Sequence, residues 1–151
     1  MYRITADYHT HTRFSHGRGT IEENVIAARK KGLKKIAISD HGFGHIGIGM
    51  SIKDISKIRK EIDRINGKYK DIEVLMGVET NLTGVDGSID IPWQYIDLFD
   101  IILMGFHKAV YPASIRDGWE LFLKNGLAAI FPKDRDRLRR QNTEAMIRAI
   151  E

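Results

Sequence analysis

No cysteine occurs among the 151 residues. This absence excludes disulfides, thiolate metal ligands and cysteine nucleophiles. Long apolar runs are missing too, because no segment approaches the roughly 20 residues of a transmembrane helix. The first residues, MYRITADYH, are too few and too polar for a signal peptide. We therefore expect a cytoplasmic protein that does not contact a membrane.

Excess charge of one sign is small, at +4, and it is concentrated in two basic runs at residues 29–35 and 133–140. Such runs are typical of solvated helix ends, and attraction of a phosphate-bearing ligand is the alternative. Asp134 and Asp136 interrupt the second run and few aromatic residues are interspersed. Nucleic acid is therefore not an expected partner.

Strand-like and helix-like segments alternate along the chain, which predicts βαβ units and a parallel sheet. TIEE at residues 20–23 is a capping box, Gly32 suits the end of that helix, and isoleucines recur at helical spacing over 52–65. With 42% hydrophobic residues, this is the length and composition of one domain. We expect strands at 2–9, 33–39, 72–78 and 99–106, and helices at 20–32, 52–65, 92–98, 114–126 and 134–151.

Side chains able to bind a metal follow each expected strand. His9 and His11 end the first strand, His41 follows the second, Glu79 the third and His107 the fourth. In a β/α barrel the carboxyl ends of the strands carry the active site. Singly, each residue could be a polar rim residue, a hydrogen-bonded histidine or a solvated acid. Their common position favours one metal site.

The spacing within the stretch DYHTHTRFSHG supports this interpretation. Side chains two apart in a strand point to the same side, so His9 and His11 can hold one ion together. Imidazole suits zinc, iron, nickel or copper, and a carboxylate such as Glu79 can bridge two ions. His16, in the following loop, is close enough to reach a further ion. His45 has no strand-end position, and we expect it to be a loop residue, with a role in binding substrate or metal as the alternative.

GFGHIG at residues 42–47 matches the dinucleotide-binding pattern G-x-G-x-x-G. Dinucleotide binding requires those glycines to open a helix directly, with an acid about 20 residues further on. The next expected helix starts only near Ser51 or Ile52, and Glu61 fits the acid position loosely. We do not expect dinucleotide binding.

The motifs DYHTHTRFSHG, AISDHG, GVE and GFH, in this order, resemble the PHP (polymerase and histidinol phosphatase) superfamily from about Asp7 to Glu151. His16 makes the chain similar to the trinuclear branch of small stand-alone hydrolases. The resemblance implies an α/β fold, here the first four to five βα units of a distorted, TIM-like (β/α)7 barrel. It also implies two or three divalent ions (Zn, Mn or Fe) and phosphoester hydrolysis.

The same resemblance implies a role for each site residue. His9 and His11 would bind the first ion, with Glu79 bridging to a second ion held by His107. His16 and His41 would bind the third. Asp7 and Asp40 would orient imidazoles. Apart from the resemblance, Arg18 lies two residues after His16 and Lys108 directly follows His107, so both are candidates to contact phosphate; a solvated loop position is the alternative for both.

The later motifs of the family, a histidine before Pro-Gly and an Asp-x-His pair, are missing, since no histidine follows His107. Residues 1–151 therefore resemble the N-terminal part of a PHP domain without its C-terminal strands. A fragment, a split gene with a complementing chain, and a homodimer sharing sheet edges are the possibilities. Each ion would lose at least one protein ligand.

The leading hypothesis is a metal-dependent phosphoesterase acting on a small phosphate ester through metal-activated water. The alternative is a non-catalytic or split-chain fragment that binds metal or a partner and needs complementation. A 3′-exonuclease is a third option. Because ligand imidazoles must be neutral, we expect metal binding and activity to collapse below about pH 6.5.

Overall fold

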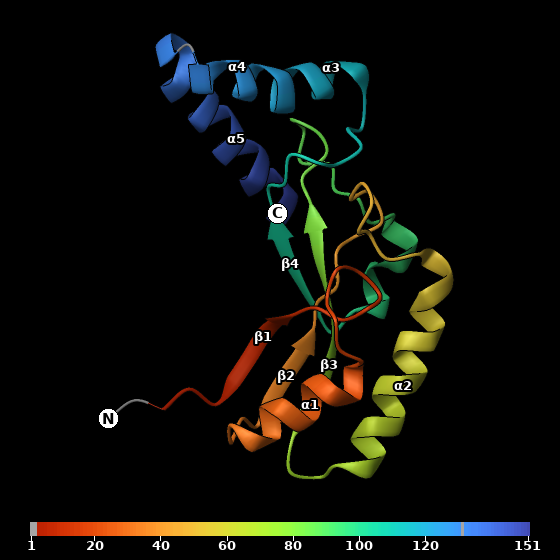
Figure 1. The fold of residues 1–151 in the computed structure, drawn as a ribbon. Coiled ribbons are helices and arrows are strands. Elements are labelled where there is room, and N and C mark those ends of the chain that lie inside the picture. Colours follow the sequence, from red (N-terminus) through yellow and green to blue (C-terminus); the bar gives the residue numbers. More distant parts are fainter. Residues whose placement is uncertain (1–2, 131) are drawn as a thin grey trace.

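A computed structural model describes residues 3–130 and 132–151. Four strands, β1 (Ala6–Thr10), β2 (Lys35–Ile38), β3 (Glu73–Asn81) and β4 (Ile101–Gly105), form one sheet in the order β1-β2-β3-β4 (Figure 1). All neighbouring strands are parallel. Sequential parallel strands are what successive βα units of a barrel produce. The expected fold class, a partial TIM-like barrel, is confirmed, with four βα strands.

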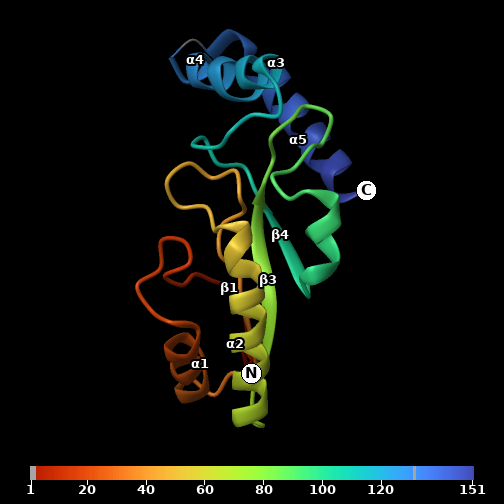
Figure 2. The same ribbon diagram turned by 90° about the vertical axis from the view of Figure 1, so that its right-hand side faces the viewer.

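Helices α1 (Ile21–Lys30) and α2 (Ile55–Lys68) lie together on one side of the sheet (Figures 1 and 2). The capping box is present: the Thr20 hydroxyl accepts from the Glu23 amide, and the Glu23 carboxylate accepts from the Thr20 amide at 2.7 Å. The regularly spaced isoleucines of α2 are buried against the sheet, as their period requires. The main core includes Val25, Ile36, Ile38, Ile58, Ile62, Ile65, Val74 and Met76.

A second group of helices follows β4 and lies beyond the ends of the strands (Figure 1). It comprises α3 (Ile115–Asp117), a π-helical stretch η3 (Gly118–Leu123), α4 (Lys124–Ile130) and α5 (Arg135–Ile150). Leu121 and Ala145 meet Leu82 there in a small separate core.

Several expected boundaries were wrong. The helix expected to end at Gly126 continues to Ile130, since Gly126 has a helical neighbour on each side and open space around its Cα, and no turn is imposed there. The first strand begins at Ala6 and not at residue 2; Tyr2 lies outside the described residues. The short helix after Pro92 is a 3-10 segment, η2 (Trp93–Leu98), and a 3-10 turn, η1 (Ile52–Asp54), precedes α2.

The carboxyl ends of the strands are brought level by the register of the sheet. Glu79 lies opposite Leu103 and Asn81 opposite Gly105 in the β3–β4 pair. A single parallel bridge joins His41, just after β2, to Glu79. The β3 strand extends three residues past the expected end, so its last residues stand among the loops. In the part of the chain that the structure describes, no helix is long and apolar enough to cross a membrane.

Candidate metal centre

The carboxylate of Glu79 lies at the centre of a cluster of imidazoles. Its Oε2 atom is 3.1 Å from His9 Nε2, 3.4 Å from His11 Nε2 and 3.2 Å from His41 Nδ1. Its Oε1 atom is 3.4 Å from His107 Nε2. Glu79 is only 6% exposed. Imidazoles that follow or end three strands, β1, β2 and β4, thus converge on one buried acid of the remaining strand, β3, as the strand-end positions indicated.

Among the residues that the structure describes, three groups of donor atoms have the spacing that a metal ion requires. Within each group the candidate ligand atoms lie within 4.8 Å of one another. The groups are His9, His11 and Glu79; His11, His16 and His41; and His41, His45 and His107. All six histidines of the chain belong to at least one group, so the structure brings together every metal-capable residue named from the sequence.

His45 lies in a loop, as expected, but the structure also brings it into one of the three groups. Its ring centroid is 4.5 Å from that of His41 and 5.3 Å from that of His107. It lies in the loop between β2 and α2, where no strand end marks it. The only signal in the sequence was its position four residues after His41.

Burial keeps two of the imidazoles neutral. Desolvation lowers the pKa of His41 to about 4, and the nearby Glu79 carboxylate opposes this shift only in part. Desolvation, followed by the charge of His16, also lowers the pKa of His11. Burial alone would raise the pKa of Glu79, but the hydrogen bond from His9 and the charge of His41 outweigh it and lower the pKa. The cluster therefore holds an anionic carboxylate beside two neutral imidazoles, those of His11 and His41, and these are the states that bind metal.

Two buried nitrogen atoms in the cluster make no hydrogen bond with any described residue, Nδ1 of His11 and Nδ1 of His41, although the latter lies 3.2 Å from Glu79 Oε2. Unpaired buried polar atoms are rare in proteins, because a buried donor or acceptor without a hydrogen bond costs about 1–3 kcal/mol of stability. Several imidazoles crowded around a carboxylate with unpaired nitrogens suit one or more divalent ions. The residues present fit a metal centre.

A hydrogen-bonded chain behind His107 was missed by the sequence analysis. Nδ1 of His107 is 2.6 Å from Oδ1 of Asn81, and Nδ2 of Asn81 donates to Oδ2 of Asp90 at 2.6 Å. Asp90 also accepts from the Thr80 hydroxyl and from the backbone amides of Asn81 and Gly44. Partners of this kind orient imidazole ligands. No short motif marks Asn81 or Asp90, since their role depends on a loop folding back on β3.

The orienting role implied for Asp7 and Asp40 is not what the structure shows. Asp40, 1% exposed, accepts from the backbone amide and hydroxyl of Thr12 and from the Ser15 hydroxyl, each at 2.6 Å. Asp7 accepts from the backbone amide of His9 at 3.1 Å. Both acids therefore hold backbone and loop, and neither hydrogen-bonds an imidazole within the described residues. The donors to these two carboxylates are backbone amides and hydroxyl groups instead of imidazoles, which explains the difference.

Arg18 is exposed in the loop between β1 and α1, and Lys108 is exposed directly after His107. Neither side chain makes a hydrogen bond or ion pair in the part of the chain described by the structure. Their contact with phosphate stays a prediction.

Two glycines of GFGHIG, Gly42 and Gly44, serve close packing, whereas Gly47 has open space around it and a φ of 82°. A Cβ atom on Gly42 would collide with the Asp90 carboxylate, and one on Gly44 would lie 2.7 Å from Asp90 Cβ. Helix α2 begins only at Ile55, so these glycines do not open a helix and the dinucleotide pattern has no structural basis. They let the loop after His41 lie directly against Asp90.

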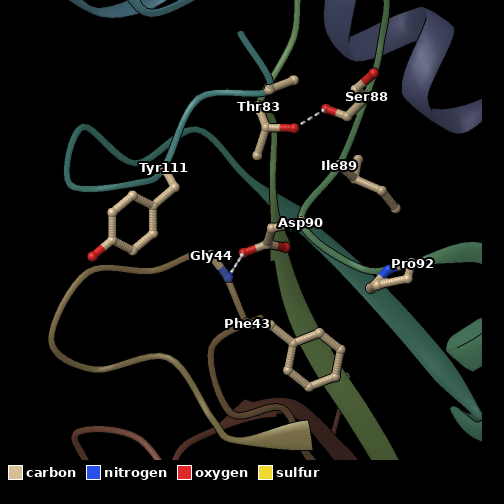
Figure 3. A pocket seen from close by; sticks show the side chains of 9 residues that line it. Phe43, Gly44, Thr83, Ser88, Ile89, Asp90, Pro92 and Tyr111 are labelled. Atoms are coloured by element: carbon tan, nitrogen blue, oxygen red, sulfur yellow. Dashed lines mark hydrogen bonds between the residues drawn. The ribbon is translucent and has the colours of Figure 1, made fainter.

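A hollow of about 380 Å³ lies beside this contact (Figure 3). Figure 3 shows Asp90 bonded to the Gly44 amide, at 3.0 Å, with Phe43 and Tyr111 on either side of Gly44. The hollow is open and lined mainly by apolar atoms. It adjoins the metal cluster through the Gly44–His45 loop.

The sequence matches the PHP domain family over residues 7–146, and the chain belongs to this family. Probable phosphatases from Shewanella baltica and Aeromonas hydrophila are each 32% identical to it, over 72% and 73% of this chain. The chain spans only 41% and 43% of the length of those two relatives. A crystal structure of histidinol phosphate phosphatase from Lactococcus lactis, complexed with zinc, L-histidinol and phosphate, has a TM-score of 0.49 at 20% identity. That comparison covers 68% of this chain and 40% of the other.

Proposed function

We propose that this chain carries the metal-binding part of a phosphoesterase that hydrolyses a small phosphate ester with water activated by two or three divalent ions, zinc, manganese or iron. The observation that carries the proposal is the convergence of four imidazoles on the buried Glu79 carboxylate. The names of the relatives, probable phosphatases from two bacteria, support the same reaction class.

The bound ions would supply Lewis acidity toward phosphate oxygens and a hydroxide near neutral pH. The residues of the chain supply neutral ligands, an anionic ligand and access for the substrate. His11 and His41 remain neutral because they are desolvated, so that their lone pairs are available without prior loss of a proton. Glu79 presents Oε2 to His9, His11 and His41 and Oε1 to His107. His9, more than half exposed, leaves the cluster open to an entering substrate.

The organic part of the substrate would lie in the hollow next to Gly44 (Figure 3). Arg18, on the neighbouring loop, would contact the phosphate group. A hollow of this size suits a small molecule rather than a polymer, and the described surface has no groove lined by basic and aromatic residues for a nucleic acid strand.

A second candidate keeps the same metal site but requires another polypeptide segment for activity, as in a complementing chain or a homodimer. It is favoured by an apolar hollow of about 820 Å³ on the β4 side of the sheet, lined by Ile91, Ile102, Met104 and Ile150 among others. Because β4 is an edge strand, an added strand could pair there and cover these side chains.

Hydrolysis of p-nitrophenyl phosphate with added Zn or Mn tests the proposal. Glu79→Gln is expected to reduce the rate at least about a hundredfold, because the central anionic ligand is lost. Glu73→Gln is the matched control: it lies on the same strand, is exposed and pairs only with Lys35. Equal rates for the two variants would contradict the proposal. Activity that appears only as the chain dimerises, followed by light scattering, would favour the second candidate.

A further inference from the structure

We propose that His45 is a metal ligand, and that His41, His45 and His107 form a complete second ion site separate from that of His9, His11 and Glu79. This inference rests on the metal centre of the proposed function. It departs from what the family resemblance implies, in which His41 would share an ion with His16 and His45 would have no role.

The first step counts lone pairs. A neutral imidazole has one protonated nitrogen and one lone pair, so it can bind only one ion at a time. The group containing His16 shares His11 with the first group and His41 with the third. Only the first and third groups have no member in common. The six histidines and Glu79 can therefore complete two sites at once, and only if His45 takes part.

The second step identifies the nitrogen that His107 offers. Besides the side-chain amide of Asn81, three donors bond to the Asp90 carboxylate. They are the backbone N–H groups of Gly44 and Asn81 and the Thr80 hydroxyl. Asn81 must therefore turn its NH₂ toward Asp90, which leaves its Oδ1 facing His107. Nδ1 of His107 then carries the proton, and the lone pair is on Nε2. That atom is the one that faces into the cluster, 3.4 Å from Glu79 Oε1.

The third step concerns the loop that carries His45. The backbone amides of Ile46 and Tyr111 donate to the carbonyls of Ala109 and Gly44, at 2.8 and 3.0 Å, which joins this loop to the one after β4. Asp90 accepts from the Gly44 amide at 3.0 Å. The neighbours of His45 on both sides are thus held to β3 and to the loop that carries His107. Hydrogen bonds within the chain therefore fix the backbone on both sides of His45.

The fourth step concerns Glu79, which the count above assigns to the first site. Its Oε2 lies 3.1 Å from His9 Nε2 and 3.4 Å from His11 Nε2. The second site borders the same carboxylate, because Oε2 is also 3.2 Å from His41 Nδ1 and Oε1 is 3.4 Å from His107 Nε2. The negative charge of Glu79 therefore favours a cation in the second site as well, whereas the three donors of that site are the imidazoles.

The test is titration of the chelator-treated, tag-free chain with Co²⁺, with ion number read from visible absorption and from elemental analysis after dialysis. We expect two ions per chain in the unsubstituted protein. His45→Ala is expected to bind one ion, and His16→Ala, the matched control within the same cluster, to keep two. His45→Asn serves as a second variant, and circular dichroism of the metal-free proteins establishes that each is folded.

The opposite pattern would overturn the inference: two ions retained by a folded His45 variant, or one lost by His16→Ala. The readout is independent of catalysis. Binding of two Co²⁺ ions without any phosphate hydrolysis would support the second ion site and contradict the proposed function. If His45→Ala still hydrolyses phosphate and binds the same number of ions, the second ion site is contradicted and the proposed function is not.

Discussion

Asp90 is linked to the candidate ligand His107 by two hydrogen bonds, through the side chain of Asn81. It nevertheless determines which ring nitrogen of His107 carries the proton. Its carboxylate accepts four hydrogen bonds, one of which fixes the amide of Asn81 and through it the tautomer of His107. The same residue holds Gly44 beside His45. One acid that touches no candidate metal ligand therefore positions two of them.

Asp90→Asn is expected to weaken Zn²⁺ or Co²⁺ binding by about tenfold to a hundredfold, the usual cost of losing an outer partner of a ligand. The new NH₂ group would face the donors that now bond to the Asp90 carboxylate, among them the NH₂ group of Asn81. The side-chain amide of Asn81 would then be free to rotate and exchange its oxygen and nitrogen. Nitrogen NMR of the metal-free chain should show the His107 proton moving from Nδ1 to a mixture of both positions.

Asp86→Asn is the control, since Asp86 is in the same loop but bonds only to Ser88 within the described residues. Unchanged affinity and tautomer in Asp90→Asn would disprove the positioning role.

The loop from Thr12 to Gly19 depends on a residue of another element. Asp40, at the end of β2, accepts three short hydrogen bonds from Thr12 and Ser15 and is almost fully buried. These bonds hold the loop that carries His16 across the sheet edge. The helix that follows, α1, is in turn started by the capping box at Thr20. Loop and helix are thus anchored at both ends.

Replacing Asp40 by Asn should lower the free energy of unfolding by about 1–3 kcal/mol, because an NH₂ group would face buried donors. Urea denaturation measures the change, and hydrogen exchange should show faster exchange of the Ser15 and Gly17 amides, which both donate to the Thr12 carbonyl. Asp71→Asn provides a comparison at an exposed pair with Arg29, where a loss of at most about 1 kcal/mol is expected. Similar losses in the two variants would argue against the anchoring role.

The whole metal-free protein should lose stability as the pH falls from about 6.5 toward 4. Over this range the unfolded chain binds a proton at residue 41 while the folded chain, in which burial lowers the pKa of His41 to about 4, does not. Stability therefore rises with pH in this window, and the loss on acidification amounts to roughly 2–3 kcal/mol at most.

Thermal melts of the chelator-treated chain at several pH values measure this slope, and His41→Gln should flatten it. A slope that His41→Gln does not change would show that other groups are responsible. With Zn²⁺ present the decline should be steeper, because protons also compete for the exposed imidazoles; the expectation that binding collapses below about pH 6.5 is tested in the same series.

Local patterns were sufficient for the parallel order of the strands, for the position of α1 and α2, and for most of the histidine cluster. A capping box, isoleucines at helical spacing and an i, i+2 histidine pair act over a few residues. In a parallel sheet the carboxyl ends must meet at one edge. His9, His41, Glu79 and His107 could therefore be placed together without knowledge of their contacts.

Only the tertiary structure decided the roles of His45, Asn81 and Asp90. Each depends on backbone pairing between segments separated by up to about 65 residues, such as the bridge from His45 to Val110 and the return of Asp90 onto β3. Loop conformations of this kind follow from hydrogen bonds between distant amides and carbonyls, which every residue type supplies and which therefore leave no mark in the sequence.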